Sequence, residues 1–252
     1  MRLKAVVLTI LSAVLIAGGF EASAQRRPGP PGNRPPREQN GPWNPAGRSY
    51  RFLIPLPGMS GCYAYMSCAF DRESNAFALT APGQNGQIPG NYAVKTDGGT
   101  TTVDLTINGQ PMGSLTSSDG GRDIKGSIMN QDILAMHWPM HLMPIMASQS
   151  DEISRRLTSP QGYRFFYELP IQGQRAIVSG KGTFADGKAN LSIDSPQMAD
   201  KFNGNSFTYR VEGDKLILTW VDRNQDYEGQ IYNKGTYIEI PFVDDSVIYI
   251  MK

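Results

Sequence analysis

Histidine and cysteine are scarce in this chain, whose 252 residues include only two of each. Few acid–base or metal centres can be assembled from so small a set, because most such centres use these side chains. Charged residues make up 19% of the chain, and the formal net charge is +1. We therefore do not expect a strongly basic surface that binds nucleic acid.

Long helical periods are also missing, whereas turn residues are abundant. The chain contains 27 glycines and 18 prolines. From residue 49 onward, short runs of β-branched and aromatic residues alternate with clusters of Gly, Asn, Asp and Pro. The run at 101–107 ends at Asn108-Gly109, and residues 97–99 and 212–214 are further predicted hairpin turns. This pattern predicts an all-β fold.

The first 24 residues have the composition of an export signal. Arg2 and Lys4 precede an apolar run over residues 5–20, and residues 22–24 (Ala-Ser-Ala) form a cleavage position. The run is shorter than the ~20 residues of a membrane-spanning helix. We therefore predict a signal peptide over 1–24 and an exported mature chain without a transmembrane segment, located in the periplasm, at the cell surface or outside the cell.

A disordered arm is predicted over residues 25–48. It holds seven prolines and five arginines but one glutamate, so it has no apolar face to bury. Seven of the 24 basic and two of the 23 acidic residues precede residue 49, which leaves a formal charge of −4 on the rest. The arm acts either as a spacer or as a basic segment that docks on an acidic surface. Trp43 is its predicted anchor on the folded part.

The two halves of the folded part resemble each other in sequence order. Tyr-Arg-Phe occurs at 50–52 and again at 163–165. This order predicts a duplication, with one β unit over 49–138, a connector over 139–162 that forms a helical turn at 151–157, and a second β unit over 163–252. Chance similarity between two β-rich segments is the alternative. Further matching pairs are Phe70 with Phe184, Tyr92 with Tyr209, and residues 132–136 with 246–250.

Each unit has room for about seven or eight antiparallel strands in a meander. Such a sheet must cover one face and protect its edges, so it is expected to close into a small barrel or to pack on its twin. In meander length and turn spacing, residues 50–137 and 163–252 resemble the lipocalin-like (calycin) small barrels of exported bacterial proteins. Both copies carry Tyr-Arg-Phe in place of the lipocalin Gly-x-Trp, so the resemblance implies a barrel but transfers no functional residue.

Cys62 and Cys68 are six residues apart, with no Gly or Pro between them. In one strand they would stand roughly 20 Å apart, whereas a disulfide requires Cα atoms about 4.4–6.8 Å apart. Export to an oxidising compartment favours a disulfide, and this geometry favours buried free thiols. Both possibilities stay open from the sequence.

Residues 136–146 contain both histidines and four of the eleven methionines. Thioether sulfur and imidazole suit copper, especially Cu(I). Alternatively, the segment is an apolar connector whose methionines fill irregular space, or a docking surface for a protein or lipid. The candidate copper ligands are Met136, His137, Met140, His141 and Met143.

Two other groups of side chains suggest function. Asp222, Asp226 and Glu228 could supply a carboxylate pair for glycoside hydrolysis, although turns and solvated strands use such residues too. The aromatic residues could line a binding face or simply pack across strands. The candidates for the binding face are Tyr63, Tyr65, Trp138, Tyr163 and Tyr167.

Together these features favour an exported, non-enzymatic binding protein that needs no cofactor. Its expected partner is an extracellular macromolecule, either a protein such as a secreted enzyme or a polysaccharide. A copper-binding protein and a carbohydrate-active hydrolase are the two alternatives.

Overall fold

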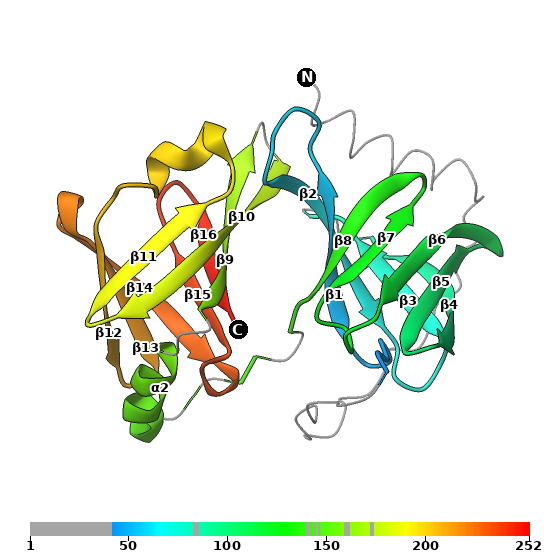
Figure 1. Cartoon of the computed structure of the whole chain (residues 1–252), viewed down its shortest axis with the longest axis horizontal. Helices are drawn as coiled ribbons and strands as arrows, with labels where there is room; N and C mark the ends of the chain where they lie inside the picture. Colours follow the sequence, from blue (N-terminus) through cyan, green and yellow to red (C-terminus); the bar gives the residue numbers. More distant parts are fainter. Residues whose placement is uncertain are drawn as a thin grey trace. The chain divides into compact units, whose positions relative to one another are not determined.

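The computed structural model describes residues 42–82, 86–139, 142–143, 145, 147–158, 162–171 and 174–252. The predicted signal peptide and residues 25–41 of the arm lie outside this part. The described chain is all-β, as predicted: sixteen strands form one hydrogen-bonded order in which two rings close (Figure 1).

The first eight strands form a meander along the chain. They are β1 (Ser49–Pro55), β2 (Cys62–Phe70), β3 (Ala76–Thr80), β4 (Ile88–Asp97), β5 (Thr100–Ile107), β6 (Gln110–Ser117), β7 (Ile124–Ile128) and β8 (Gln131–His137). Each strand pairs with the next one, and β1 pairs with both β2 and β8. The meander therefore closes into an eight-stranded barrel in which no strand keeps an open edge.

The last eight strands repeat this arrangement. They are β9 (Tyr163–Ile171), β10 (Gln174–Ala185), β11 (Lys188–Ile193), β12 (Phe207–Glu212), β13 (Lys215–Trp220), β14 (Gln225–Tyr232), β15 (Tyr237–Pro241) and β16 (Val247–Met251). The second ring closes because β9 pairs antiparallel with both β10 and β16. The predicted hairpin turns at 97–99, 108–109 and 212–214 connect neighbouring strands in the two rings.

The turn at Asn108-Gly109 shows why Asn followed by Gly predicts a hairpin turn. Both residues have positive φ, 51° and 74°. A two-residue hairpin turn whose twist matches the flanking strands requires positive φ at both positions, which Asn and Gly adopt more readily than other residues. The same requirement selects Gly98 and Gly99 between β4 and β5, with φ of 53° and 86°.

Contacts divide the described chain into two units, and the main division falls between Trp138 and Pro139. Unit 1 comprises residues 42–52, 67–80 and 86–138. Unit 2 comprises residues 53–66, 81–82 and the described residues from Pro139 onward. Segment 53–66, which the sequence analysis placed in the first unit, groups with unit 2 because the start of β2 pairs with Ile177 and Val178 of β10.

Each barrel contains a trio of aromatic rings that meet edge to face. In unit 1 the ring of Phe70 lies 5.7 Å from Tyr50 and 5.0 Å from Tyr92, centroid to centroid. In unit 2 the ring of Phe184 lies 5.8 Å from one tyrosine and 5.0 Å from another. These two tyrosines are Tyr163 and Tyr209, so the six residues are the ones that the sequence comparison paired. The duplication stays a prediction, and this shared geometry supports it.

The barrel of unit 2 is covered at both ends (Figure 1). At one end lies α2 (Ser150–Leu157), the helix predicted at 151–157, which buries Ile153 and Leu157. Ile153 packs on Gly235, where a Cβ atom would lie 2.7 Å from its Cδ1 atom. At the other end lies the β11–β12 connection with η2 (Pro196–Lys201). None of the described helical segments is long and apolar enough to cross a membrane.

Phe202, just after η2, fills the inside of this second end. Its side chain is fully buried, and its ring centroid lies 5.0 Å from that of Phe165 and 4.9 Å from that of Tyr167. Phe242 stacks on it at 5.7 Å. Aromatic rings of the protein itself therefore occupy the interior of the barrel here.

Trp43 anchors the end of the arm on unit 1, as predicted. The side chain is 2% exposed, and its Nε1 atom donates a hydrogen bond of 2.9 Å to the hydroxyl of Tyr50. The ring lies over Gly121, where a Cβ atom would approach Trp43 Cδ1 to 2.4 Å. Only glycine permits this approach, and its φ of 91° also favours glycine.

We expect Trp43→Ala to lower the free energy of unfolding by about 3–5 kcal/mol, because a buried aromatic ring is removed and leaves a cavity. Trp43→Phe keeps most of the ring but loses the donor to Tyr50, so it should cost about 1 kcal/mol. Urea denaturation of a chain of residues 25–252 measures both values. Equal stability of wild type and Trp43→Ala would show that the arm is not anchored here.

Candidate functional site

Both cysteines lie in β2, and their thiols are free and buried. The predicted alternative of a disulfide is therefore wrong, because one extended strand holds the two residues far apart. Cys62 Sγ donates a hydrogen bond of 3.2 Å to Ser195 Oγ. Burial raises the pKa of Cys62, and burial raises the pKa of Cys68 well above its usual value. Protonated, buried thiols are poor nucleophiles and poor metal ligands.

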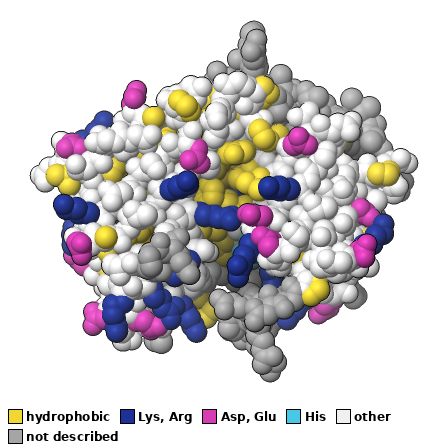
Figure 2. Space-filling view, viewed as in Figure 1, with side chains coloured by type: hydrophobic (Ala, Val, Ile, Leu, Met, Phe, Trp, Pro, Cys, Tyr) yellow, Lys and Arg dark blue, Asp and Glu magenta, His cyan; other side chains and the backbone are white. Residues whose placement is uncertain are grey.

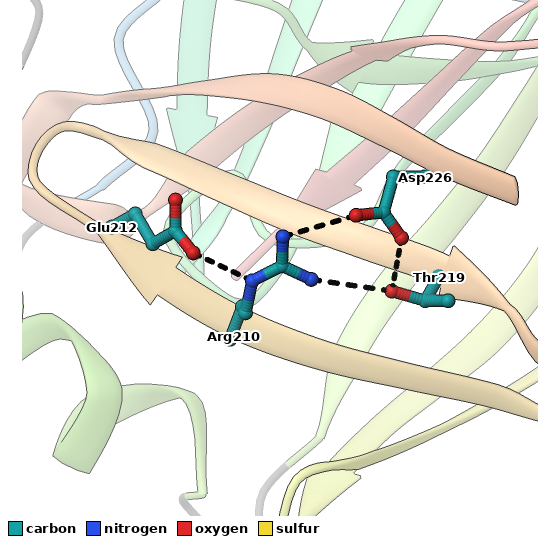
Figure 3. Close-up of polar contacts among 4 residues, drawn as sticks. All are labelled: Arg210, Glu212, Thr219 and Asp226. Carbon is teal, nitrogen blue, oxygen red and sulfur yellow. Dashed lines mark hydrogen bonds and ion pairs between the residues drawn. The ribbon is translucent and has the colours of Figure 1, made fainter.

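Two of the predicted acidic residues, Asp226 and Glu228, lie on the outer face of β14, whereas Asp222 lies in the short helical turn η3 (Val221–Arg223). Basic and hydroxyl groups of β12 and β13 pair with Asp226 (Figure 3). Arg210 bridges Glu212, at 2.6 Å, and Asp226, at 3.0 Å. Thr219 donates a further hydrogen bond of 2.6 Å to Asp226. Hydrogen bonds from Thr219 and Arg210 lower the pKa of Asp226, so it is ionised at neutral pH. A general acid requires a raised pKa, and Asp226 shows the opposite.

The other two acidic candidates are also engaged. Glu228 forms an ion pair with Lys215. Asp222 accepts a hydrogen bond of 3.1 Å from the backbone N–H of Ser206, which ties the β13–β14 turn to the β11–β12 connection. Each of the three carboxylates therefore has a hydrogen-bond or ion-pair partner among the described residues, and their role in hydrolysis stays a prediction.

These ion pairs cover an apolar side chain. Ile217 lies between Arg210 and Glu228 in the register of β12–β14. Its neighbours Leu216 and Leu218 are fully buried inside the barrel, so alternation directs Ile217 outward, yet Ile217 is only 3% exposed. Arg210 and Glu228 flank Ile217 in the register, and the aliphatic parts of such charged side chains cover neighbouring apolar surface. The outer face of β12–β14 is thus a fixed layer of alternating charges, which we call the charged face.

Both signs of charge are also interspersed over the side of the molecule drawn in Figure 2. In unit 1, Lys95 and Asp104 form a similar exposed cross-strand pair at 2.7 Å. This pair provides a matched comparison for the charged face of unit 2.

The five aromatic candidates do not form one exposed face. Tyr163 and Tyr167 are 5% and 0% exposed and belong to the core of unit 2, as the packing alternative predicts. Tyr65 is buried as well, whereas Tyr63 and Trp138 are half-buried. The guanidinium carbon of Arg51 lies 3.6 Å above the ring of Trp138.

Glu168 is a buried carboxylate that the sequence analysis missed. Its side chain is 4% exposed, and its Oε1 atom accepts a hydrogen bond of 3.0 Å from the hydroxyl of Tyr65. Arg175 of β10 forms an ion pair with the same oxygen and also donates to the backbone carbonyl of Asp245 at 3.1 Å. The sequence signal was present: Glu168 is the only charged residue between Arg164 and Arg175, within a strand of aromatic and apolar residues.

The structure separates the described part of the Met/His segment into different environments. Met136 is 5% exposed in β8, so its thioether belongs to the core. His137 ends β8, and its ring meets Tyr50 edge to face at 5.7 Å. Met143 is 61% exposed, and its backbone exchanges hydrogen bonds with Asn233. Met140 and His141 lie outside the described residues, so the copper site stays a prediction.

The second end of unit 2 holds another group that the sequence did not indicate. Trp220, Tyr227 and Phe242 meet there, and the Phe242 ring centroid lies 5.8 Å from that of Trp220 and 4.2 Å from that of Tyr227. Arg223 of η3 (Val221–Arg223) lies 4.0 Å above the centre of the Trp220 ring. We call Trp220, Tyr227 and Phe242 the aromatic end cluster.

Comparisons with known proteins do not place this chain in a family. No protein-family model and no curated protein matches it. A solved structure of a “Putative DNA polymerase III beta subunit” from Eubacterium rectale is 10% identical, with a TM-score of 0.12. The match covers 81% of this chain and 56% of that chain, so this chain spans little more than half of that protein. So low a TM-score supports no conclusion about fold or function.

We expect Glu168→Gln to lower the free energy of unfolding by about 2–3 kcal/mol. Loss of the charge leaves Arg175 without its buried partner, although partial solvation of Arg175 reduces the cost below that of a fully buried pair. Glu228→Gln, which breaks a solvent-exposed pair, should leave the melting temperature close to that of wild type. Urea and thermal denaturation test this pair of variants. Equal losses of unfolding free energy in Glu168→Gln and Glu228→Gln would contradict the larger contribution of Glu168 to stability.

Acid should destabilise unit 1 through His137. Partial desolvation of the imidazole beside Tyr50, and then the nearby charge of Arg48, lower the pKa of His137 from 6.5 to about 4, although the residue as a whole is exposed at the end of β8 and solvent therefore weakens the effect. The folded state therefore disfavours the charged imidazole, so this contribution to stability is complete above pH 6.5 and is lost as the pH falls from 6.5 toward 4. We expect the fall in melting temperature between pH 7 and pH 4.5 to be smaller in His137→Phe than in wild type. Carboxylates titrate in both proteins, so an equal fall would contradict the assignment to His137.

Proposed function

We propose that this chain is an exported, non-enzymatic binding protein that engages an extracellular macromolecule. The observation that carries the proposal is the charged face of unit 2. Arg210, Glu212 and Asp226 are held by one another, and Thr219 holds the last of them (Figure 3). A polar surface whose side chains are already ordered loses little conformational entropy when a partner binds.

The scaffold beneath the charged face suits this role. Strands β12, β13 and β14 belong to a closed ring, and their register is continuous from Phe207 to Gln230. The face therefore cannot be extended by pairing with another strand edge, and recognition has to use side chains. An alternation of positive and negative groups favours a protein partner with the complementary pattern, because misplaced like charges oppose other partners. A polysaccharide is the other outcome of the test.

The environments of the side chains that could act as nucleophiles or acid–base groups support the proposal of a non-enzymatic protein. The two thiols are buried with raised pKa values, and Asp226 is ionised and paired. Glu168 is tied to Tyr65 and Arg175. A nucleophile or general acid–base group needs a free position facing a substrate, and these groups are committed to other parts of the fold.

The test exchanges charges without removing the ion pair. Swapping Lys215 and Glu228 (Lys215→Glu with Glu228→Lys) keeps the pair but reverses the pattern on the charged face. We expect the swap to weaken binding to the extracellular partner about tenfold, with little change in melting temperature. Partners are sought by surface plasmon resonance with purified secreted proteins and cell-surface polysaccharides against the mature chain.

The control swaps Lys95 and Asp104 in unit 1, which should leave binding unchanged. Equal weakening by both swaps, or by neither, would remove the charged face from the interface. In parallel, the mature chain is assayed on glycans, peptides and esters. Turnover that disappears in Asp226→Asn would replace the binding proposal with the hydrolase, and copper retained in native mass spectra of the exported protein would favour the copper alternative.

A further inference from the structure

The charged face and the adjoining strand β15 carry a surplus of negative charge. Two cations stand against five carboxylates on this surface, which leaves an unbalanced charge of −3. Both cations are already engaged, one by two carboxylates and the other by one. The cations are Arg210 and Lys215, and the carboxylates are Glu212, Asp214, Asp226, Glu228 and Glu239.

Asp214 and Glu239 have no cationic partner in the described part of the chain, where each accepts hydrogen bonds from neutral groups only. Lys215 shows how closely the carboxylates are spaced. Glu228 first, and then Asp214 and Glu212, raise its pKa. A further cation on this surface would therefore be attracted by several carboxylates at once.

Glu239 lies between another carboxylate and an aromatic ring. It is opposite Gln230 in the register, so Glu228 and Tyr232 are its diagonal neighbours on β14, at about 7–8 Å. Tyr232 is half-buried, and burial and then the charge of Glu239 raise its pKa, so the carboxylate lies near the phenol. This pair suits arginine better than lysine, because the planar guanidinium can bind the carboxylate and stack on the ring.

The arm is the part of this chain with the opposite charge. Residues 25–41 contain four arginines and one glutamate, a formal charge of +3. Arg34 and Arg37 flank Pro35-Pro36. In the polyproline II conformation that this sequence favours, residues three apart lie on the same side, about 9 Å from each other. This spacing is close to that of the carboxylates at 228 and 239, and prolines reduce the entropy that is lost when such a segment binds.

The arm is also tethered within reach of a large surface. It enters the described chain at Pro42, beside the anchored ring of Trp43. At about 3.1 Å per residue, residues 25–41 extend up to about 50 Å from this point. Attachment to the same chain gives the arginines a high effective concentration, so contacts that are individually weak can form together.

We propose that the arm docks on the charged face and on Glu239 of the same chain. Arg34 and Arg37 pair with Glu228 and Glu239, and the guanidinium beside Glu239 stacks on Tyr232. The docked arm occupies the surface that an extracellular partner would use, so partner and arm compete for it. This competition rests on the proposed function, whereas the docking does not.

Paramagnetic broadening in NMR spectra tests the docking without any partner. A nitroxide label is attached at Asn33→Cys in a chain of residues 25–252. Cys62 and Cys68 are buried and have raised pKa values, so they react slowly with the label. We expect the label to broaden the amide signals of Gln230 and Glu239. About 0.5 M NaCl should restore these signals, because salt screens exposed charges.

Three substitutions neutralise the surplus and leave one ion pair at each cation. We expect them to reduce the broadening at least about threefold, with a melting temperature close to that of wild type, because exposed charges contribute little to stability. They are Glu212→Gln, Asp214→Asn and Glu239→Gln. The matched control removes three exposed carboxylates from unit 1 and should leave the broadening unchanged. It consists of Glu73→Gln, Asp97→Asn and Asp132→Asn.

Absence of broadening, or an equal reduction in both triple variants, overturns the proposal. Broadening in a mixture of labelled chains and ¹⁵N-enriched chains without label would assign the arm to a second copy and overturn docking within one chain. Replacing the four arginines of the arm by Gln should tighten binding of the extracellular partner about threefold. A docked arm together with unchanged partner affinity would refute the competition, so the failure of the proposed interface can be told from the failure of docking.

Discussion

The rest of this structure depends on the closure of each eight-stranded meander into a ring. An open sheet leaves a row of unpaired N–H and C=O groups at each edge, and these groups invite pairing with other chains. Here β1 pairs with both β2 and β8, and β9 pairs with both β10 and β16, so each ring uses up its own edges. Once a ring closes, alternate residues of every strand must fill one enclosed space.

Aromatic side chains fill much of that space. The trios around Phe70 and Phe184 have nearly the same centroid distances, which shows that two different sequences solve the same packing problem in the same way. In unit 2, Phe202 enters from a connection rather than a strand and completes the filling of one end. Because the described interior is closely packed by side chains of the protein itself, the outer face of the barrel is the surface that can meet a partner.

Polar groups on the outer face of the unit 2 barrel and polar groups inside it differ in whether they have hydrogen-bond partners. On the outer face, Arg210, Asp226 and Lys215 lie in a network that also shields Ile217, so charge and hydrophobic burial support each other. Inside the aromatic end cluster, Nε1 of Trp220 and the hydroxyl of Tyr227 have no hydrogen-bond partner in the described part of the chain. The paired groups of the charged face form an ordered polar surface, and this order is the property on which the proposed interface depends.

The sequence by itself determined the all-β class and the turn positions such as Asn108-Gly109, because alternation and turn chemistry are local properties of the chain. It also predicted the anchoring role of Trp43. The correspondence of Phe70 with Phe184 stays a prediction. The sequence could not show which strand faces would meet. Segment 53–66 groups with unit 2 through its pairing with β10. Glu168 accepts a hydrogen bond from the hydroxyl of Tyr65, which is 103 residues away in the sequence. Alternation of apolar and polar residues with a period of two predicts which side chains of a strand are buried. It does not predict which residues bury them, and the closure and packing of the rings decide those partners.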